Sequence, residues 1–109
     1  MPKTIQCILM EYKELIESLN HEHVKAVILY GSYARGDYTE DSDIDIMILV
    51  DLSEEEIQKS RDRVSDFTYD FNWQYDVQIV PVVQNIQHFN YWKKVYLFYR
   101  NVEEEGVLI

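Results

Sequence analysis

Cysteine, proline and glycine are scarce in this chain of 109 residues, which has one, two and three of them respectively. The single cysteine, Cys7, allows no disulfide within the chain, so we infer a reducing compartment and a fold held together by packing. Hydrophobic residues make up 47% of the sequence, which is enough for the core of one domain at this length. We therefore expect a single domain over residues 1–109.

Long hydrophobic runs are also missing. No apolar stretch approaches the ~20 residues that a membrane-spanning helix needs. The first residues, Met1-Pro2-Lys3, lead into an amphipathic segment that contains acids, which is not the pattern of a secretory signal. We predict a cytoplasmic protein that does not bind membranes.

Basic residues are few: the chain has 10 lysines and arginines against 20 aspartates and glutamates, a net charge of −10 at pH 7. A protein that holds DNA or RNA by the phosphates needs a basic surface. The charge therefore argues against nucleic-acid binding by this chain alone. It favours a protein partner that carries a basic patch, because opposite charges steer association.

Helical and strand patterns alternate along the chain. The connections between strands are too short for a uniform parallel sheet, so we predict an α/β (α+β) fold with a small mixed β-sheet and helices packed on one face. Helices are expected at residues 3–19, 53–71 and 86–101, and strands at 24–30, 43–50, 75–82 and 106–109.

Two acids open the strand predicted at 43–50. Successive side chains of a strand point to opposite faces, so Asp43 and Asp45 share one face while the alternate isoleucines share the other. Two adjacent carboxylates repel each other unless a cation lies between them. Oxygen ligands of this kind suit Mg²⁺, which binds carboxylates together with substrate phosphates. The pair therefore predicts a metal site on the open face of the sheet.

The preceding strand, 24–30, ends at a pattern that suits a phosphate. Gly31 lacks a Cβ, which allows a phosphate to approach the backbone, and Ser32 adds a hydroxyl. A short helix is expected from Tyr33 to Arg35, and the guanidinium of Arg35 can make a forked contact with a triphosphate.

The two patterns together, Gly31-Ser32 followed after ten residues by Asp43-x-Asp45, are specific. The combination resembles the nucleotidyltransferase superfamily related to DNA polymerase beta. At this length the chain looks like the minimal nucleotidyltransferases that are paired with HEPN-domain toxins. That family has a third catalytic carboxylate on a later strand, and Asp76 is the position that matches it.

The resemblance implies a nucleotidyltransferase fold and a metal-dependent reaction. The enzyme would transfer a nucleoside monophosphate, most plausibly AMP from ATP, to a hydroxyl acceptor, with pyrophosphate as the leaving group. The acceptor implied is a tyrosine of a HEPN toxin partner, which would make this chain an antitoxin. The predicted catalytic and metal-binding residues, for two Mg²⁺ or Mn²⁺ ions, are Asp43, Asp45 and Asp76. The predicted nucleotide-binding residues are Gly31, Ser32, Arg35 and Ser42.

Two other functions remain open at this point. An antibiotic-modifying nucleotidyltransferase would share the site, and its cationic aminoglycoside substrates would suit the acidic charge, although such enzymes carry an additional domain. A non-enzymatic module that only binds a partner is the second alternative.

Aromatic residues are concentrated in the segment 86–101. They form two adjacent helical rows, which we interpret mainly as a wide core-facing surface; the alternative is an exposed patch that binds a partner or a second copy in a homo-oligomer. Trp73 and the remaining tyrosines are predicted to be packing residues. The first row consists of Phe89, Trp92, Tyr96 and Tyr99, and the second of Tyr91, Val95, Phe98 and Val102.

Overall fold

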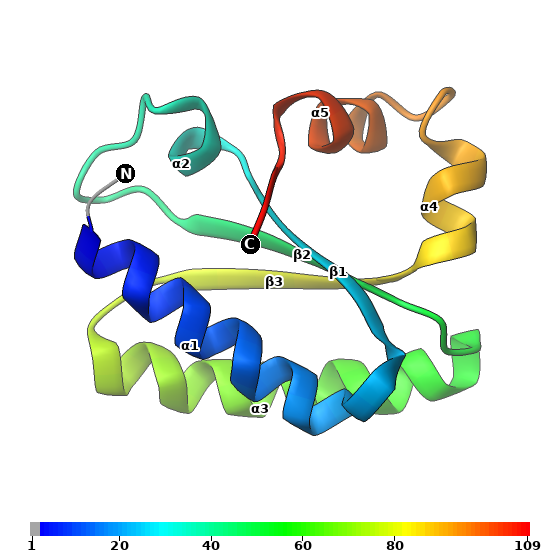
Figure 1. Cartoon of the computed structure of the whole chain (residues 1–109), viewed down its shortest axis with the longest axis horizontal. Helices are drawn as coiled ribbons and strands as arrows, with labels where there is room; N and C mark the ends of the chain where they lie inside the picture. Colours follow the sequence, from blue (N-terminus) through cyan, green and yellow to red (C-terminus); the bar gives the residue numbers. More distant parts are fainter. Residues whose placement is uncertain (1–2) are drawn as a thin grey trace.

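The computed structural model describes residues 3–109 and contains a four-stranded mixed sheet with the strand order β3-β2-β1-β4 (Figure 1). β2 runs parallel to β3 and antiparallel to β1, and β1 is antiparallel to β4. The predicted α/β fold with a small mixed sheet is therefore confirmed, but helices pack on both faces of the sheet and not on one. The strands are β1 (Val24–Tyr30), β2 (Ile44–Val50), β3 (Ile79–Asn85) and β4 (Val107–Leu108). The helices are α1 (Lys3–Asn20), the 3₁₀ helix η1 (His21–His23), α2 (Ser32–Arg35), α3 (Glu54–Tyr75), α4 (Ile86–Trp92) and α5 (Leu97–Glu105).

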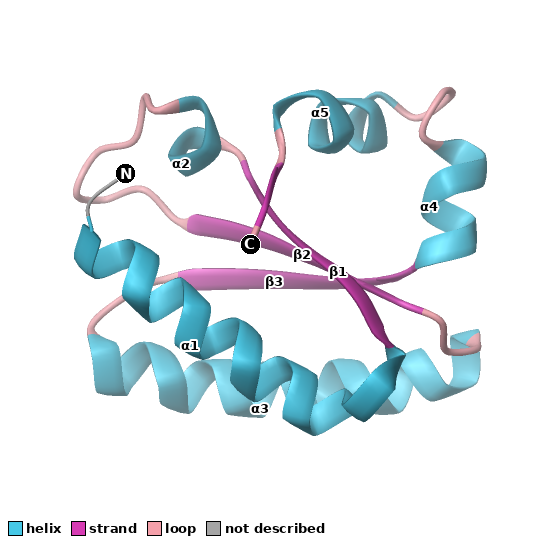
Figure 2. Ribbon diagram, in the orientation of Figure 1, coloured by secondary structure: helices cyan, strands magenta, loops and turns pink. Residues whose placement is uncertain are grey.

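One face of the sheet is covered by α1 and α3, which lie on the same side of it in Figure 2. The alternation predicted for β2 holds, because Ile44, Ile46, Ile48 and Val50 are each at most 2% exposed in this core. None of the helices within residues 3–109 is both long and apolar enough to cross a membrane.

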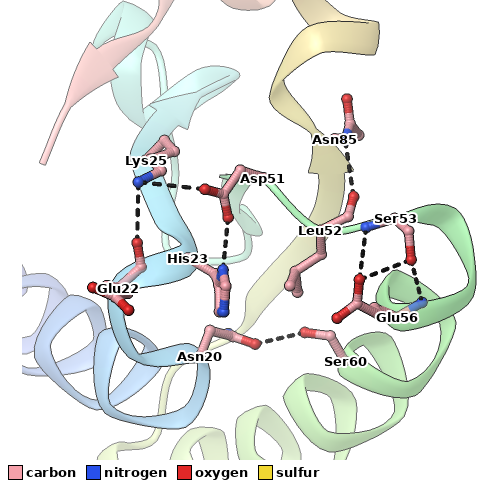
Figure 3. A network of polar contacts seen from close by, with 10 residues as sticks. All are labelled: Asn20, Glu22, His23, Lys25, Asp51, Leu52, Ser53, Glu56, Ser60 and Asn85. Atoms are coloured by element: carbon pink, nitrogen blue, oxygen red, sulfur yellow. Dashed lines mark hydrogen bonds and ion pairs between the residues drawn. The ribbon is translucent and has the colours of Figure 1, made fainter.

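A network of polar contacts lies at the end of the sheet opposite Asp43 and Asp45 (Figure 3). The capping box predicted at the start of α3 is present, with Ser53 and Glu56 satisfying each other's backbone N–H groups. His23 contacts Asp51 at 2.8 Å, and the Asn85 amide donates to the Leu52 carbonyl at 2.8 Å. These contacts link the start of β1, the end of β2 and the end of β3, and so help to fix the strand register on which the site depends.

The second face of the sheet is only partly open. A second buried cluster joins Met47 and Leu49 of the sheet to Phe89, Tyr99 and Val102 of α4 and α5. The prediction of one helix over 86–101 is wrong, since the chain turns after α4 and starts α5 afresh. A straight helix would rise 1.5 Å per residue away from the end of β3, whereas the turn brings α5 back over the sheet (Figure 1). The face above Asp43 and Asp45 remains accessible.

The connection between α3 and β3 also differs from the prediction. The helix continues to Tyr75 and ends on Asp76, which adopts the left-handed conformation with φ 53° and ψ 50°. The side chain of Asn72 fixes the turn, because it accepts from the N–H of Ile79 at 3.0 Å and donates to its carbonyl at 3.1 Å. The strand therefore begins at Ile79, and the prediction that Asp76 opens a strand is wrong.

Candidate active site

The turn after β1 brings the two predicted patterns into contact. Gly31 has φ 73° and ψ −154°, a conformation open essentially to glycine alone. A Cβ at Gly31 would overlap the carboxylate of Asp45. The Asp45 side chain therefore lies directly against the Gly31 backbone, and the structure joins the glycine–serine turn to the acidic pair.

Asp45 lies on the open face at the start of β2, next to the exposed Asp43. Desolvation, and to a lesser degree repulsion from Asp43, raises the pKa of Asp45, while the charge of Arg35 opposes the rise. Two carboxylates so placed favour a cation, and the donor set fits Mg²⁺, which needs only one or two carboxylates when substrate phosphates supply further oxygens. Asp43 and Asp45 therefore fit one such ion.

The third predicted carboxylate is not gathered with this pair. Among residues 3–109 no three His, Cys, Asp or Glu side chains lie close enough to hold a metal ion. The parallel pairing of Ile44 with Ile79, and the hydrogen bond of 2.8 Å from the Ile44 N–H to the Gln78 carbonyl, place Gln78 beside Asp43 at the strand ends. Asp76 is two residues further back, exposed in the turn. Its role in holding a second ion, or in taking a proton, stays a prediction.

Replacing Asp76 with asparagine tests that role cleanly. Asparagine tolerates the left-handed conformation of this helix cap, so we expect the melting temperature to change little. If the carboxylate serves the chemistry, transfer falls by roughly two orders of magnitude while Mg-ATP affinity is largely kept, because the acidic pair remains. Single-turnover rates and titration calorimetry measure the two effects. Full activity in Asp76→Asn would assign the role to another group. Gln78→Glu is the matched variant, because it adds a carboxylate at the residue beside Asp43.

Arg35 is already engaged in two exposed ion pairs. Its Nη1 lies 3.1 Å from Glu105 at the end of α5, and its Nε lies 3.3 Å from Asp37. The hydrogen bond to Glu105, followed by that to Asp37, raises the pKa of Arg35. A triphosphate at Gly31 and Ser32 would share this guanidinium with both carboxylates or displace them.

The hydroxyl of Ser42 closes the loop that precedes β2. It accepts from the Thr39 N–H at 2.8 Å, and the Ser42 N–H donates to the Thr39 carbonyl at 3.1 Å. This contact shapes the approach to Asp43. Direct nucleotide binding by Ser42 stays a prediction.

Tyr30 is a site residue that the sequence reasoning missed. It pairs with Asp45 across β1 and β2, and its ring packs edge-on against Phe98 at 5.7 Å. Burial, with the charge of Asp45 adding to it, raises the pKa of Tyr30 to about 12. The neutral phenol of Tyr30 thus lies beside the acidic pair on its β1 side. The sequence feature that could have identified Tyr30 as a site residue is its position directly before Gly31, at the end of the predicted strand.

On the β3 side an open cleft of about 600 Å³ reaches Ser42, the residue before Asp43, although Asp43 and Asp45 themselves do not line it. The prediction that Trp73 is a packing residue is wrong, because it is 75% exposed and lines this cleft together with Tyr69, which is 64% exposed. The spacing of four residues between Tyr69 and Trp73 on one helix could have indicated that the two rings lie side by side on one helix face. The cleft walls also include Tyr33, Glu40, Ser42, Asp76, Gln78 and Val80.

Comparison with known proteins agrees with this geometry. A family model described as "Nucleotidyltransferase domain" matches residues 9–109. The chain is 42% identical over 98 residues to a protein of Methanocaldococcus jannaschii named "Putative protein adenylyltransferase MJ0604", covering 86% of this chain and 89% of that protein. It is 37% identical over 76 residues to MJ0141, a second protein of that organism with the same description, covering 70% of this chain and 75% of the relative.

A solved structure shows the same fold. The crystal structure of a "putative nucleotidyltransferase" from Sulfolobus solfataricus superposes with a TM-score of 0.61 at 22% identity, covering 96% of this chain and 80% of the other. The glycine–serine turn, the adjoining acidic pair and the match over residues 9–109 lead to one conclusion. The chain belongs to the nucleotidyltransferase domain family.

Proposed function

We propose that this chain is a protein adenylyltransferase that moves AMP from ATP to a hydroxyl group of a protein. The observation that carries the proposal is the Asp45 carboxylate held against the Gly31-Ser32 turn, with Asp43 beside it. The names of the M. jannaschii relatives support a protein as the acceptor. The net charge of −10 supports it as well, since a polyanionic acceptor would be repelled.

In the reaction, the acceptor oxygen bonds to the α-phosphorus of ATP, and the bond from that phosphorus to the oxygen bridging to the β-phosphate breaks. Pyrophosphate leaves with the bonding electron pair. Asp43 and Asp45 would hold Mg²⁺, which supplies charge neutralisation to the triphosphate when bound. The proton of the acceptor hydroxyl passes to a carboxylate, for which Asp76 is our candidate.

The remaining groups bind and orient the nucleotide. Gly31 leaves room for the Asp45 carboxylate against the backbone of the turn, and the Ser32 hydroxyl would donate a hydrogen bond to the phosphates. Arg35 offsets the charge that develops on the leaving pyrophosphate. Tyr30, neutral at physiological pH, lies beside Asp45 on the side of β1 without adding a third negative charge to the acidic pair.

We further propose that the acceptor is a tyrosine of a HEPN-domain toxin and that its modification silences the toxin. The family resemblance supports this partner. A protein that cleaves RNA needs a basic surface, which complements the acidic charge of this chain.

Labelled ATP tests the function directly. The chain is incubated with Mg²⁺, α-labelled ATP and the product of the adjacent gene, with tRNA as a competing acceptor. We expect label on the protein and none on tRNA, and no label with Asp43→Asn or with EDTA. Label on tRNA alone would contradict the protein acceptor while leaving nucleotidyl transfer intact.

A further inference from the structure

The cleft on the β3 side adjoins the acidic pair but differs from the glycine–serine turn in its chemistry. Its walls contain Ser42, the residue before Asp43, and Val80, the register partner of Asp45. The turn at Gly31 reaches Asp45 from β1, on the opposite side. The acidic pair therefore adjoins both the turn that suits a triphosphate and the cleft, which Tyr33 of α2 also lines.

The lining of the cleft does not suit phosphate. It includes the carboxylates of Glu40 and Asp76, and no lysine, arginine or histidine is among the lining residues. A triphosphate there would face negative charge without a counter-ion. A cationic group would find carboxylates together with the two exposed rings of Tyr69 and Trp73, whose faces attract cations.

A line of acidic and aromatic side chains extends from the cleft along the outer face of α3, which also carries the exposed Lys59 and Arg63. Asp62, Asp66, Tyr69 and Trp73 follow one another at helical spacing and are all exposed, on the side opposite the buried Val64 and Phe71. The rings of Tyr69 and Trp73 meet edge-on with centroids 6.4 Å apart. No ion pair within residues 3–109 involves Asp62 or Asp66. We call these four residues the α3 stripe.

We propose that the cleft and the α3 stripe form the acceptor-binding surface and take a polypeptide segment that carries arginine or lysine next to the hydroxyl that is modified. The inference rests on the proposed function, because it assigns the cleft to the second substrate of that reaction. The cations of the segment lie on Trp73 and Tyr69 and pair with the carboxylates of the stripe. Its hydroxyl oxygen then reaches the α-phosphorus beside Asp43, and pyrophosphate leaves toward Arg35.

Charge favours this occupant over the nucleoside of ATP, whereas the rings alone would also stack on a base. A nucleoside is neutral and would gain nothing from Asp62 and Asp66. These acids lie on the outer face of α3, about two and three turns before Trp73 along the helix, a reach that suits an extended segment several residues long. Only a cationic polymer uses both the cleft and the stripe.

The test uses two capped pentapeptides with a central tyrosine, one flanked by arginines and the other by glutamates. Titration calorimetry with the full chain is expected to show binding of the arginine peptide, weakened by added salt, and no binding of the glutamate peptide. The Tyr69→Ala/Trp73→Ala double variant should lose about tenfold in affinity for the arginine peptide, the size expected for exposed cation–π contacts. Asp62→Asn/Asp66→Asn should lower that affinity and reduce its salt dependence.

Two controls separate this surface from the nucleotide site. Tyr91→Ala removes an aromatic ring that is 73% exposed on α4 and should leave peptide affinity unchanged. Mg-ATP affinity should be the same in the wild type and in the Tyr69→Ala/Trp73→Ala variant, while the acceptor KM rises and kcat changes little. Equal binding of the two peptides, or a loss of Mg-ATP affinity in place of peptide affinity, would overturn the proposal. Charge-selective peptide binding by a wild-type chain that does not bind Mg-ATP would refute the proposed function and retain the cation-binding surface.

Discussion

Replacing Asp45 with asparagine is expected to abolish Mg-ATP binding and, at the same time, to make the folded chain more stable at neutral pH. Loss of the carboxylate removes half of the predicted metal site. Even outer-sphere partners of metal ligands contribute 10–100-fold, so we expect transfer to fall by at least about a hundredfold. The gain in stability follows from the raised pKa of Asp45, since the charged form is disfavoured by desolvation and by Asp43.

The sign of the pH dependence follows from that shift. A carboxyl with a raised pKa in the folded state stabilises the fold at acid pH, where it is protonated, and loses this contribution as the pH rises through the folded pKa. The melting temperature of Asp45→Asn should therefore exceed that of the wild type by more at pH 7 than in acid. Asp41→Asn, at an exposed position in the loop before β2, is the matched control and should change neither the melting temperature nor the Mg-ATP affinity. An Asp45→Asn variant that melts lower at pH 7, or that binds Mg-ATP normally, would refute the electrostatic picture of the site.

The acidic pair and the glycine–serine turn could be predicted from sequence because local rules place them. Side-chain alternation puts Asp43 and Asp45 on one face of a strand, and glycine marks the backbone turn. Their mutual contact was not deducible from either rule alone. It depends on the antiparallel register that pairs Tyr30 with Asp45, which long-range packing sets.

Asp76 was assigned to a strand because the sequence shows an acid before an apolar run. In the structure the helix ends there, with a hydrogen bond from the Asp76 N–H to the Asn72 carbonyl. The Asn72 side chain then makes two hydrogen bonds to the backbone of Ile79 across the turn. Aspartate is one of the few residues that accept the left-handed conformation, but pattern reading does not distinguish such a cap from a strand start. The helix break after Trp92 was missed for a related reason, since neither glycine nor proline marks it.

The second large effect is expected from Gly31→Ala, which should lower both stability and activity. An alanine at position 31 would have to adopt a backbone conformation that costs roughly 1–3 kcal/mol for residues other than glycine. Its methyl group also overlaps the carboxylate of Asp45. The Asp45 side chain can escape only by moving away from the turn, which would displace a predicted metal ligand.

Gly36→Ala provides the matched comparison. Gly36 also has a positive φ, 90°, but a Cβ there would have no atom within 4 Å. In Gly36→Ala the free energy of unfolding should fall only by the backbone strain, roughly 1–2 kcal/mol, and the transfer rate per folded molecule should be kept. Since about 1 kcal/mol shifts the melting temperature of a domain of this size by roughly 4–8 °C, thermal denaturation resolves the two variants. We expect Gly31→Ala to melt below Gly36→Ala and to bind Mg-ATP at least tenfold more weakly, by analogy with the effect of disturbing a metal ligand. If both variants lose stability equally and both keep Mg-ATP affinity, the contact between Gly31 and Asp45 does not organise the site.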